Sequence, residues 1–344
     1  MTALISPARK NPAAQAIETL LKSRETGIVL ALLLVLVATT VRSPAFLVST
    51  DGFRDLLLTP AIFVLLAIGQ AMVIITRNID LSVGSVVGLT AYLTGRLFID
   101  FPGMPIPVVI IAGIALGALL GLINGALIAY AKVPALVVTL GTLYIYRGVD
   151  VWWVGRKPIN ASDMPRDFLG FGVSSFLNIP TLAIIAALVL VAVGWCMKTT
   201  RGGRELYAIG SDPSAATLYG LRITKRVIHA FVACGALTGL AGVLFAARYG
   251  TVDSQAGTGF ELISVAAAVV GGIAIFGGSG SVLGAAIGAV LLLTINRALP
   301  LLGVQDFWQQ AVVGALILGA IALDRVLSLR QFHKLIEIRD NAND

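Results

Sequence analysis

The sequence holds few side chains that could make or break bonds. It has two His and two Cys, and both Cys196 and Cys234 lie in apolar runs. No group of His, Cys and acidic residues has the spacing of metal ligands. No Gly is followed directly by Lys, which excludes a Walker A nucleotide loop. The sequence therefore predicts no catalytic residues, no metal site and no cofactor in this chain.

Polar side chains within apolar segments are the better candidates for acting on a solute. Asp80 lies in the stretch NIDLSVGS at 78–85 between long apolar runs, and ionisable groups at membrane depth suggest function. We interpret Asp80 as a helix cap or gate, with Arg77 as an alternative ion partner, rather than as a direct solute contact. Ordinary interhelical hydrogen bonding is the alternative for each polar residue. The candidate pathway or gate residues are Asn78, Asp80, Ser82, Asn124, Thr139, Thr142 and Asn296.

The segment 198–226 carries the clearest local signal. Ser211 or Asp212 suits an N-cap, Pro213 suits a first helical turn, and Gly220 suits a helix end. This pattern predicts a helix of about seven residues, roughly 10 Å long, outside the membrane. It is either a helix on the lipid surface or a docking element for a cytoplasmic partner.

These residues must be positioned by membrane helices. Of 344 residues, 57% are apolar and 12% are charged, against about 25% charged in soluble proteins. This composition excludes a secreted disulfide scaffold, a disordered chain and a coiled coil. The net charge of +7 is scattered between apolar segments, which argues against nucleic-acid binding.

A span needs about 20 mostly apolar residues, and we count about ten such segments. The predicted fold is an all-α integral membrane protein with a tail 1–26, a transmembrane domain 27–325 and a tail 326–344. An inner loop 198–226 and an outer loop 150–177 are the longest connections, and the third span is a candidate broken helix. The predicted spans are 27–41, 57–76, 80–97, 108–130, 134–151, 178–197, 226–248, 260–277, 281–299 and 307–324.

Charge sets the orientation. With both termini in the cytoplasm, the inside segments hold 16 of the 25 Lys and Arg residues and nine of the 18 acidic residues. The inside therefore carries 16 − 9 = +7 and the outside 9 − 9 = 0, as the positive-inside rule requires.

A weak internal repeat accompanies this topology. LGALLG at 116–121 recurs as LGAAIG at 283–288, and the start of the third span is similar to the start of the eighth. An offset of five spans would make two inverted repeats, as in several transporter folds. The alternative is chance recurrence of small residues. Gly113, Gly117 and Gly121 have the spacing of close helix packing, which we favour as their role.

The chain resembles the permease subunits of ABC sugar importers of the ribose, arabinose, xylose and rhamnose type, which include the autoinducer-2 importer permeases. The resemblance extends from about residue 70 to 325. Residues 146–149 with Trp152 and Trp153 are most similar to the rhamnose and autoinducer-2 branches. The motifs are NIDLSVGS at 78–85, VPALVVTLGT at 133–142, the segment 203–220, GTGFEL at 257–262 and GGSG at 277–280.

The resemblance implies a complex of several chains in the bacterial inner membrane. The permease would pair with a copy of itself or a related permease. A cytoplasmic subunit would bind ATP and Mg, and an external binding protein would deliver the sugar. The family's coupling helix falls on 212–220, which makes Arg204, Asp212, Pro213, Ala216 and Gly220 the candidate ATPase-coupling residues. The candidate contacts for the binding protein are Arg147, Asp150, Trp152, Asp163 and Arg166.

Two other classes remain as alternatives. A secondary carrier driven by protons or sodium would usually place acidic residues near the middle of the membrane, whereas Asp80, Glu261 and Asp324 lie at the ends of predicted spans. A membrane-embedded enzyme would need the catalytic groups that the sequence lacks. We therefore expect an import permease surrounded by lipid and driven by a partner ATPase.

Overall fold

The computed structural model describes residues 24–305 together with 307–308, 310–312, 314–315, 318–319 and 322. Of the predicted tails 1–26 and 326–344 only residues 24–26 are described, and the predicted span 307–324 is described in part. The regular structure of the described residues is helical apart from a short antiparallel pair, β1 (Ser175–Phe176) and β2 (Ile179–Pro180), and an isolated bridge between Ile159 and Val252. Its helices are α2 (Arg24–Arg42), α3 (Ala45–Val48), α4 (Thr50–Ile75), α5 (Val83–Asp100), α6 (Ile106–Ala131), α7 (Ala135–Val154), η1 (Ala161–Asp163), α8 (Arg166–Val173), α9 (Thr181–Thr199), α10 (Arg201–Ser211), α11 (Pro213–Leu218), α12 (Ile223–Tyr249), α13 (Phe260–Val270) and α14 (Val282–Leu301).

The all-α membrane architecture is confirmed. Each of the first nine predicted spans contains a helix, although the helix in the eighth, α13, covers only part of 260–277. Within the described residues, five helices are long and apolar enough to cross a membrane, namely α4, α6, α9, α12 and α14. The total of about ten spans stays a prediction, since the last segment is only partly described.

The break in a span lies in the eighth segment, whereas the sequence pointed to the third. α5 is continuous over 18 residues, while α13 ends at Val270 after 11 residues, about 16 Å of helix against a core of about 30 Å. Gly272, Gly277, Gly278 and Gly280 all have positive φ. Glycine favours such backbone over helix, so 271–281 forms a loop.

α4 is the centre of the bundle. It is buried on every side over most of its length and packs against α12, α14, α9 and α13. By contrast, α9 exposes Leu188, Val191 and Trp195. Apolar side chains of this size on an outer helix belong against lipid.

α6 and α12 form the closest helix pair. A Cβ atom added at Gly117 would overlap the carbonyl oxygen of Gly235, and one added at Gly239 would overlap that of Gly113. Small residues permit this approach of two backbones in a membrane. The predicted packing role of Gly113, Gly117 and Gly121 is confirmed.

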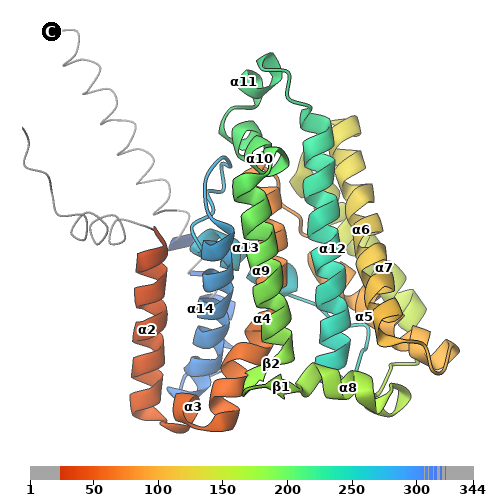
Figure 1. Cartoon of the computed structure of the whole chain (residues 1–344), viewed down its shortest axis with the longest axis vertical. Coiled ribbons are helices and arrows are strands. Elements are labelled where there is room, and N and C mark those ends of the chain that lie inside the picture. The colour runs from red at the N-terminus through yellow and green to blue at the C-terminus, as the bar shows by residue number, and fades with distance from the viewer. Residues whose placement is uncertain are drawn as a thin grey trace, which may run out of the picture.

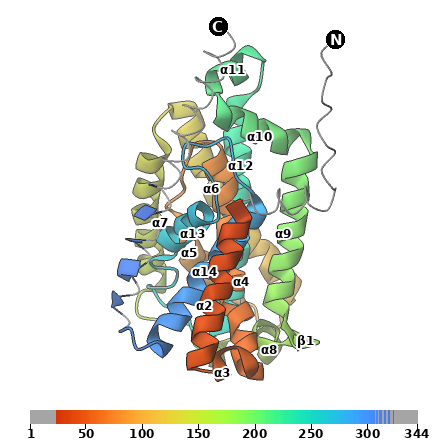
Figure 2. The same ribbon diagram turned by 90° about the vertical axis from the view of Figure 1, so that its left-hand side faces the viewer.

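The two long connections lie at opposite ends of the molecule. Figure 1 places α10 and α11 at the top and α3, α8 and β1 at the bottom, and Figure 2 shows the same separation after a quarter turn. The segments 198–226 and 150–177 therefore face opposite sides of a membrane crossed by this bundle.

Candidate functional site

A buried group of polar side chains surrounds the loop that joins α4 to α5. α4 ends at Ile75, where the Thr76 hydroxyl donates to the Val73 carbonyl at 2.7 Å and Arg77 takes a φ of +66°. The chain then runs irregularly to Val83, the first residue of α5. We call Gln70, Asp80, Ser82, Asn124, Thr139 and Tyr146 the polar centre, because they meet around this loop.

Asp80 is the acceptor that organises the polar centre. Its Oδ1 accepts from the Ser82 amide at 2.9 Å and from the Ser82 hydroxyl at 2.7 Å. The Asn124 Nδ2, from α6, lies 3.5 Å from the same oxygen and 2.8 Å from Ser82 Oγ. The side chain of Gln70, from α4, donates to the Asp80 carbonyl. Asp80 is 2% exposed, so it holds three segments together from within.

α7 closes the polar centre from the other side. The Thr139 hydroxyl donates to the Ile79 carbonyl at 3.1 Å, and the Tyr146 hydroxyl lies 3.3 Å from Asn124 Oδ1. Buried polar groups that satisfy one another in this way fix one arrangement of their helices. The polar centre is thus suited to act as a latch between α4, α6 and α7.

The structure brings together four of the seven candidate pathway residues: Asp80, Ser82, Asn124 and Thr139. The Thr142 hydroxyl donates to the Thr139 carbonyl of its own helix, at 3.3 Å. Asn78 stays local, donating to the Thr76 carbonyl at 2.9 Å. Asn296 lies apart on α14, in a cavity of about 200 Å³ that it shares with Asp55 and Arg297.

Arg77 does not pair with Asp80. Its Nε donates to the Gly210 carbonyl at 2.5 Å and its NH2 group donates to the Ser211 carbonyl at 2.6 Å. The Gly278 amide donates to the Ile75 carbonyl at 2.9 Å. We call Ile75, Arg77, Gly210, Ser211 and Gly278 the junction, because it ties the end of α4 to α10 and to the loop 271–281. Sequence reasoning missed it, since its parts are far apart in the chain.

The segment 198–226 contains the predicted short helix and one more. Asp212 is the N-cap of α11, accepting from the amides of Ser214 and Ala215 at 2.9 and 3.0 Å. Gly220 has a φ of +74°. The predicted cap and helix end are thus confirmed. Of the other coupling candidates, Pro213 is the first residue of α11 and Ala216 is its buried residue. The Arg204 guanidinium donates to the Thr199 carbonyl at 2.7 Å.

The helix that the sequence did not predict is α10. Its Tyr207 hydroxyl donates to the Gly280 carbonyl at 3.1 Å, and its Gly210 packs directly on the Ile75 carbonyl. Beyond it, Leu218 and Tyr219 at the end of α11 are 88% and 87% exposed. Two large apolar side chains at the tip of a projecting loop could be covered by a protein partner. Their exposure could not be read from the sequence.

At the opposite end, two of the five candidate contacts for a binding protein lie beneath the surface. Asp150 is fully buried, and its carboxylate pairs with Arg147 at 3.2 Å. Arg147 also donates to the Ala256 carbonyl at 2.7 Å, so the pair holds the segment before α13. Trp152, Asp163 and Arg166 are exposed, and Asp163 takes part in a capping box with Asn160.

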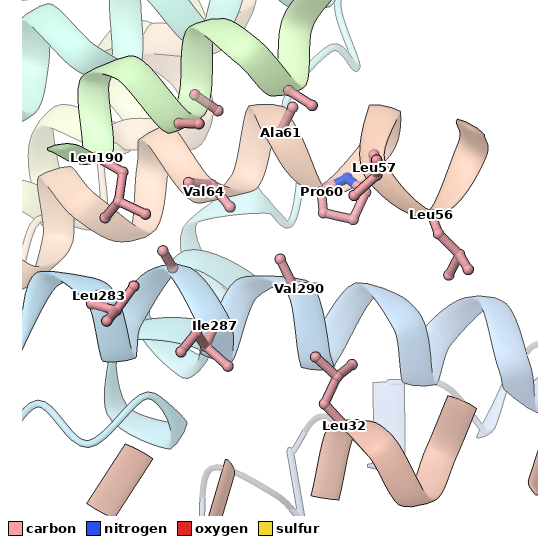
Figure 3. A pocket seen from close by; sticks show the side chains of 14 residues that line it. Leu32, Leu56, Leu57, Pro60, Ala61, Val64, Leu190, Leu283, Ile287 and Val290 are labelled. Carbon is pink, nitrogen blue, oxygen red and sulfur yellow. The ribbon is translucent and has the colours of Figure 1, made fainter. Parts of the chain in front are cut away.

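An apolar cavity of about 230 Å³ lies between α2, α4, α9 and α14. Figure 3 shows Leu190 of α9, Val64 of α4 and Ile287 of α14 pointing toward it. Its lining side chains are hydrocarbon, so it offers a polar solute no hydrogen bonds. We therefore place the candidate site at the polar centre and the junction.

Comparison with known proteins agrees with this architecture. The family described as "Branched-chain amino acid transport system / permease component" matches residues 52–321. The "Autoinducer 2 import system permease protein LsrC" of Enterobacter sp. (strain 638) is 37% identical over 308 residues, covering 89% of this chain and 88% of that protein. The protein of the same name from Salmonella paratyphi B is 39% identical over 263 residues, covering 76% and 75%.

The LsrC protein of Escherichia coli O157:H7 is 36% identical over 306 residues, covering 88% of this chain and 87% of that protein. No solved structure matches the chain. The resemblance to sugar importer permeases is confirmed by these matches, which run through the helices that carry the polar centre and the junction. The chain therefore belongs to this permease family and is the membrane-embedded permease subunit of an ABC importer.

Proposed function

We propose that this permease imports a small sugar or a sugar-like signal of the autoinducer-2 type across the bacterial inner membrane. The name of the relatives supports this substrate class. Both termini would lie in the cytoplasm, since that orientation places the excess positive charge inside. α10 and α11 would then face a partner ATPase, which binds ATP and Mg, and α8 would face a sugar-binding protein.

One observation carries the coupling mechanism. The contacts run without interruption from α11 to the polar centre, through α10 and the junction. The Arg77 guanidinium donates hydrogen bonds to the carbonyls of Gly210 and Ser211. Asp80 follows three residues later in the same short loop. Because only the N-cap residue Asp212 separates Ser211 from α11, a push on the exposed Leu218 and Tyr219 would reach Arg77 through the backbone.

Such a push would open and close the solute path. If α10 shifts, the Arg77 bonds draw the loop 76–82 with it, and the hydrogen bonds of Asp80 to Ser82 and Asn124 must rearrange. Buried networks of this kind have discrete arrangements rather than a continuum. The path itself would lie at the interface with a second permease, a copy or a relative.

The exposed residues at the α8 end are the proposed contacts for the binding protein. Trp152 is 80% exposed, and exposed Trp and Arg side chains are frequent anchors of protein interfaces. Trp152, Asp163 and Arg166 would therefore make contact directly. Arg147 and Asp150 would support that surface from below.

The partner composition tests the function as a whole. Mass spectrometry of what co-purifies with the tagged chain from native membranes in mild detergent is expected to find an ATPase subunit in fixed stoichiometry. It would also distinguish one permease from two. Recovery of this chain alone, under conditions that preserve other ABC importers, would favour the secondary carrier instead.

The α11 cap tests the coupling mechanism. Asp212→Ala removes the acceptor for two backbone amides, which costs about 1 kcal/mol of helix stability. We expect normal membrane insertion but a several-fold loss of ATP-dependent uptake in proteoliposomes. Asp212→Asn, which can still cap, should retain most of the uptake. Arg204→Ala is expected to resemble Asp212→Ala, and wild-type uptake in both alanine variants would contradict the role of this segment.

A further inference from the structure

A cavity beside α11 is lined largely by positive side chains that the coupling mechanism does not use. It lies between α10, the loop after α11 and the start of α12, and its volume is about 410 Å³. Arg201, Arg222, Lys225, Arg226 and His229 line it, with Glu205 as its acidic residue. We call it the basic cavity.

Four of these residues form a stripe on α12. Arg222, Lys225, Arg226 and His229 follow the spacing i, i+3, i+4 and i+7, which places them on one helical face over about 10 Å. Arg222 is the N-cap residue of α12, and the first turn contains no acidic residue. The positive end of the helix dipole therefore adds to the charge of the side chains.

The carboxylate of Glu205 in the cavity already has two arginine partners. Glu205 accepts from Arg201 Nε at 2.7 Å and from Arg226 Nε. The hydrogen bond from Arg226, and to a smaller extent that from Arg201, lowers the pKa of Glu205 and keeps its carboxyl group ionised at neutral pH. Within residues 24–305, Arg222 and Lys225 form no ion pair, and both are exposed. Among the described residues, four Lys and Arg side chains and one carboxylate give the cavity a net charge of 4 − 1 = +3, and the exposed Arg222 and Lys225 contribute two of these charges.

The position of the basic cavity along the membrane normal favours a lipid headgroup as the anion that would bind there. α9 is apolar and exposed at Leu188, Val191 and Trp195, and it gives way to Lys198 and Arg201 where α10 begins. α12 changes in the same way, from the basic stripe to an apolar span after His229. The cavity therefore lies at the level where hydrocarbon meets phosphate headgroups.

We propose that the basic cavity binds the phosphate of an anionic phospholipid from the cytoplasmic leaflet. Basic pockets at the cytoplasmic ends of spans suit such headgroups. The wall includes Gly220 and Leu221, which directly follow α11. A bound headgroup would therefore steady the hinge of the coupling helix and make transport depend on membrane composition. The identity of the transported solute does not enter this proposal.

Native mass spectrometry of the full-length permease in detergent tests the proposal. Phosphatidylglycerol and phosphatidylcholine are titrated separately, with inorganic phosphate as a competitor. The cavity variant is Arg222→Gln with Lys225→Gln. The matched control is Lys132→Gln with Lys198→Gln, which removes the same charge from residues outside the cavity. We expect the wild type to prefer phosphatidylglycerol, and the cavity variant to bind it roughly tenfold more weakly, with the control nearly unchanged.

The other outcomes would overturn the proposal. An equal loss in both variants would indicate attraction to overall charge, and equal binding of phosphatidylcholine would indicate an ordinary lipid shell. Displacement of the lipid by inorganic phosphate at low concentration would indicate a site for a soluble phosphate. If the cavity variant lost a co-purifying ATPase subunit but kept phosphatidylglycerol, the stripe would be a protein docking surface.

Discussion

Asp80→Ala is expected to reduce the amount of folded permease in the membrane severely. The substitution leaves the amide and the hydroxyl of Ser82 without their acceptor inside the protein. An unsatisfied buried donor costs about 1–3 kcal/mol, so the two together cost about 2–6 kcal/mol, which reaches the lower end of the stability of many domains, about 5–15 kcal/mol. Fluorescence-detected size exclusion would measure the monodisperse fraction, and thermal denaturation of the remaining protein would give the loss of stability.

Two further variants separate the role of this carboxylate from that of its loop. Asp80→Asn keeps an acceptor oxygen and should fold, because its Oδ1 can still accept from Ser82. Asn78→Ala is the matched control, since Asn78 donates only to Thr76 in the same loop. A folded and fully active Asp80→Ala protein would refute the organising role of Asp80.

Gly210→Ala is expected to abolish most uptake while leaving the spans in the membrane. A Cβ at this position would overlap the carbonyl oxygen of Ile75 and lie 2.6 Å from the Gly278 amide nitrogen. Both are backbone groups and cannot swing aside. Moving these groups apart breaks the hydrogen bonds from Arg77 to Gly210 and Ser211. ATP-driven uptake in proteoliposomes should therefore fall at least about tenfold, the equivalent of about 1.4 kcal/mol.

A loss of function in Gly210→Ala would have to come from the lost backbone contact, because helix propensity alone predicts the opposite effect. Within a helix, Gly→Ala ordinarily stabilises by about 0.5–1 kcal/mol. Gly194→Ala in α9 should therefore be neutral or stabilising, since a Cβ there meets nothing within 4 Å. If both substitutions preserved uptake equally, the junction would not transmit motion.

The parts of the fold that were predictable depend on neighbours in sequence. Runs of apolar residues predicted the spans, and the order Asp212, Pro213, Gly220 predicted the cap and end of α11, because cap chemistry is local. The charge of the loops predicted that 198–226 and 150–177 lie at opposite ends, which agrees with Figure 1.

The parts that were missed depend on contacts between distant segments. Arg77 could bond to the nearby Asp80 or to a carbonyl 133 residues away, and only the packing of Gly210 on α4 decides for the second. The burial of Asp150 likewise depends on the loop 254–256 folding back onto α7. The loop 271–281 after α13 packs closely on Ile75 at Gly277 and on Ser211 at Gly278, which are contacts with distant segments.

The close pair of α6 and α12 has a consequence for how the transporter moves. At Gly113, Gly117 and Gly239 the two backbones are in direct contact, so neither helix can slide or rotate past the other without a steric clash. We therefore expect the pair to move as one rigid body during a transport cycle. α12 starts beside the coupling segment and ends beside α8, so a tilt begun on the ATP side would arrive undiminished at the opposite face.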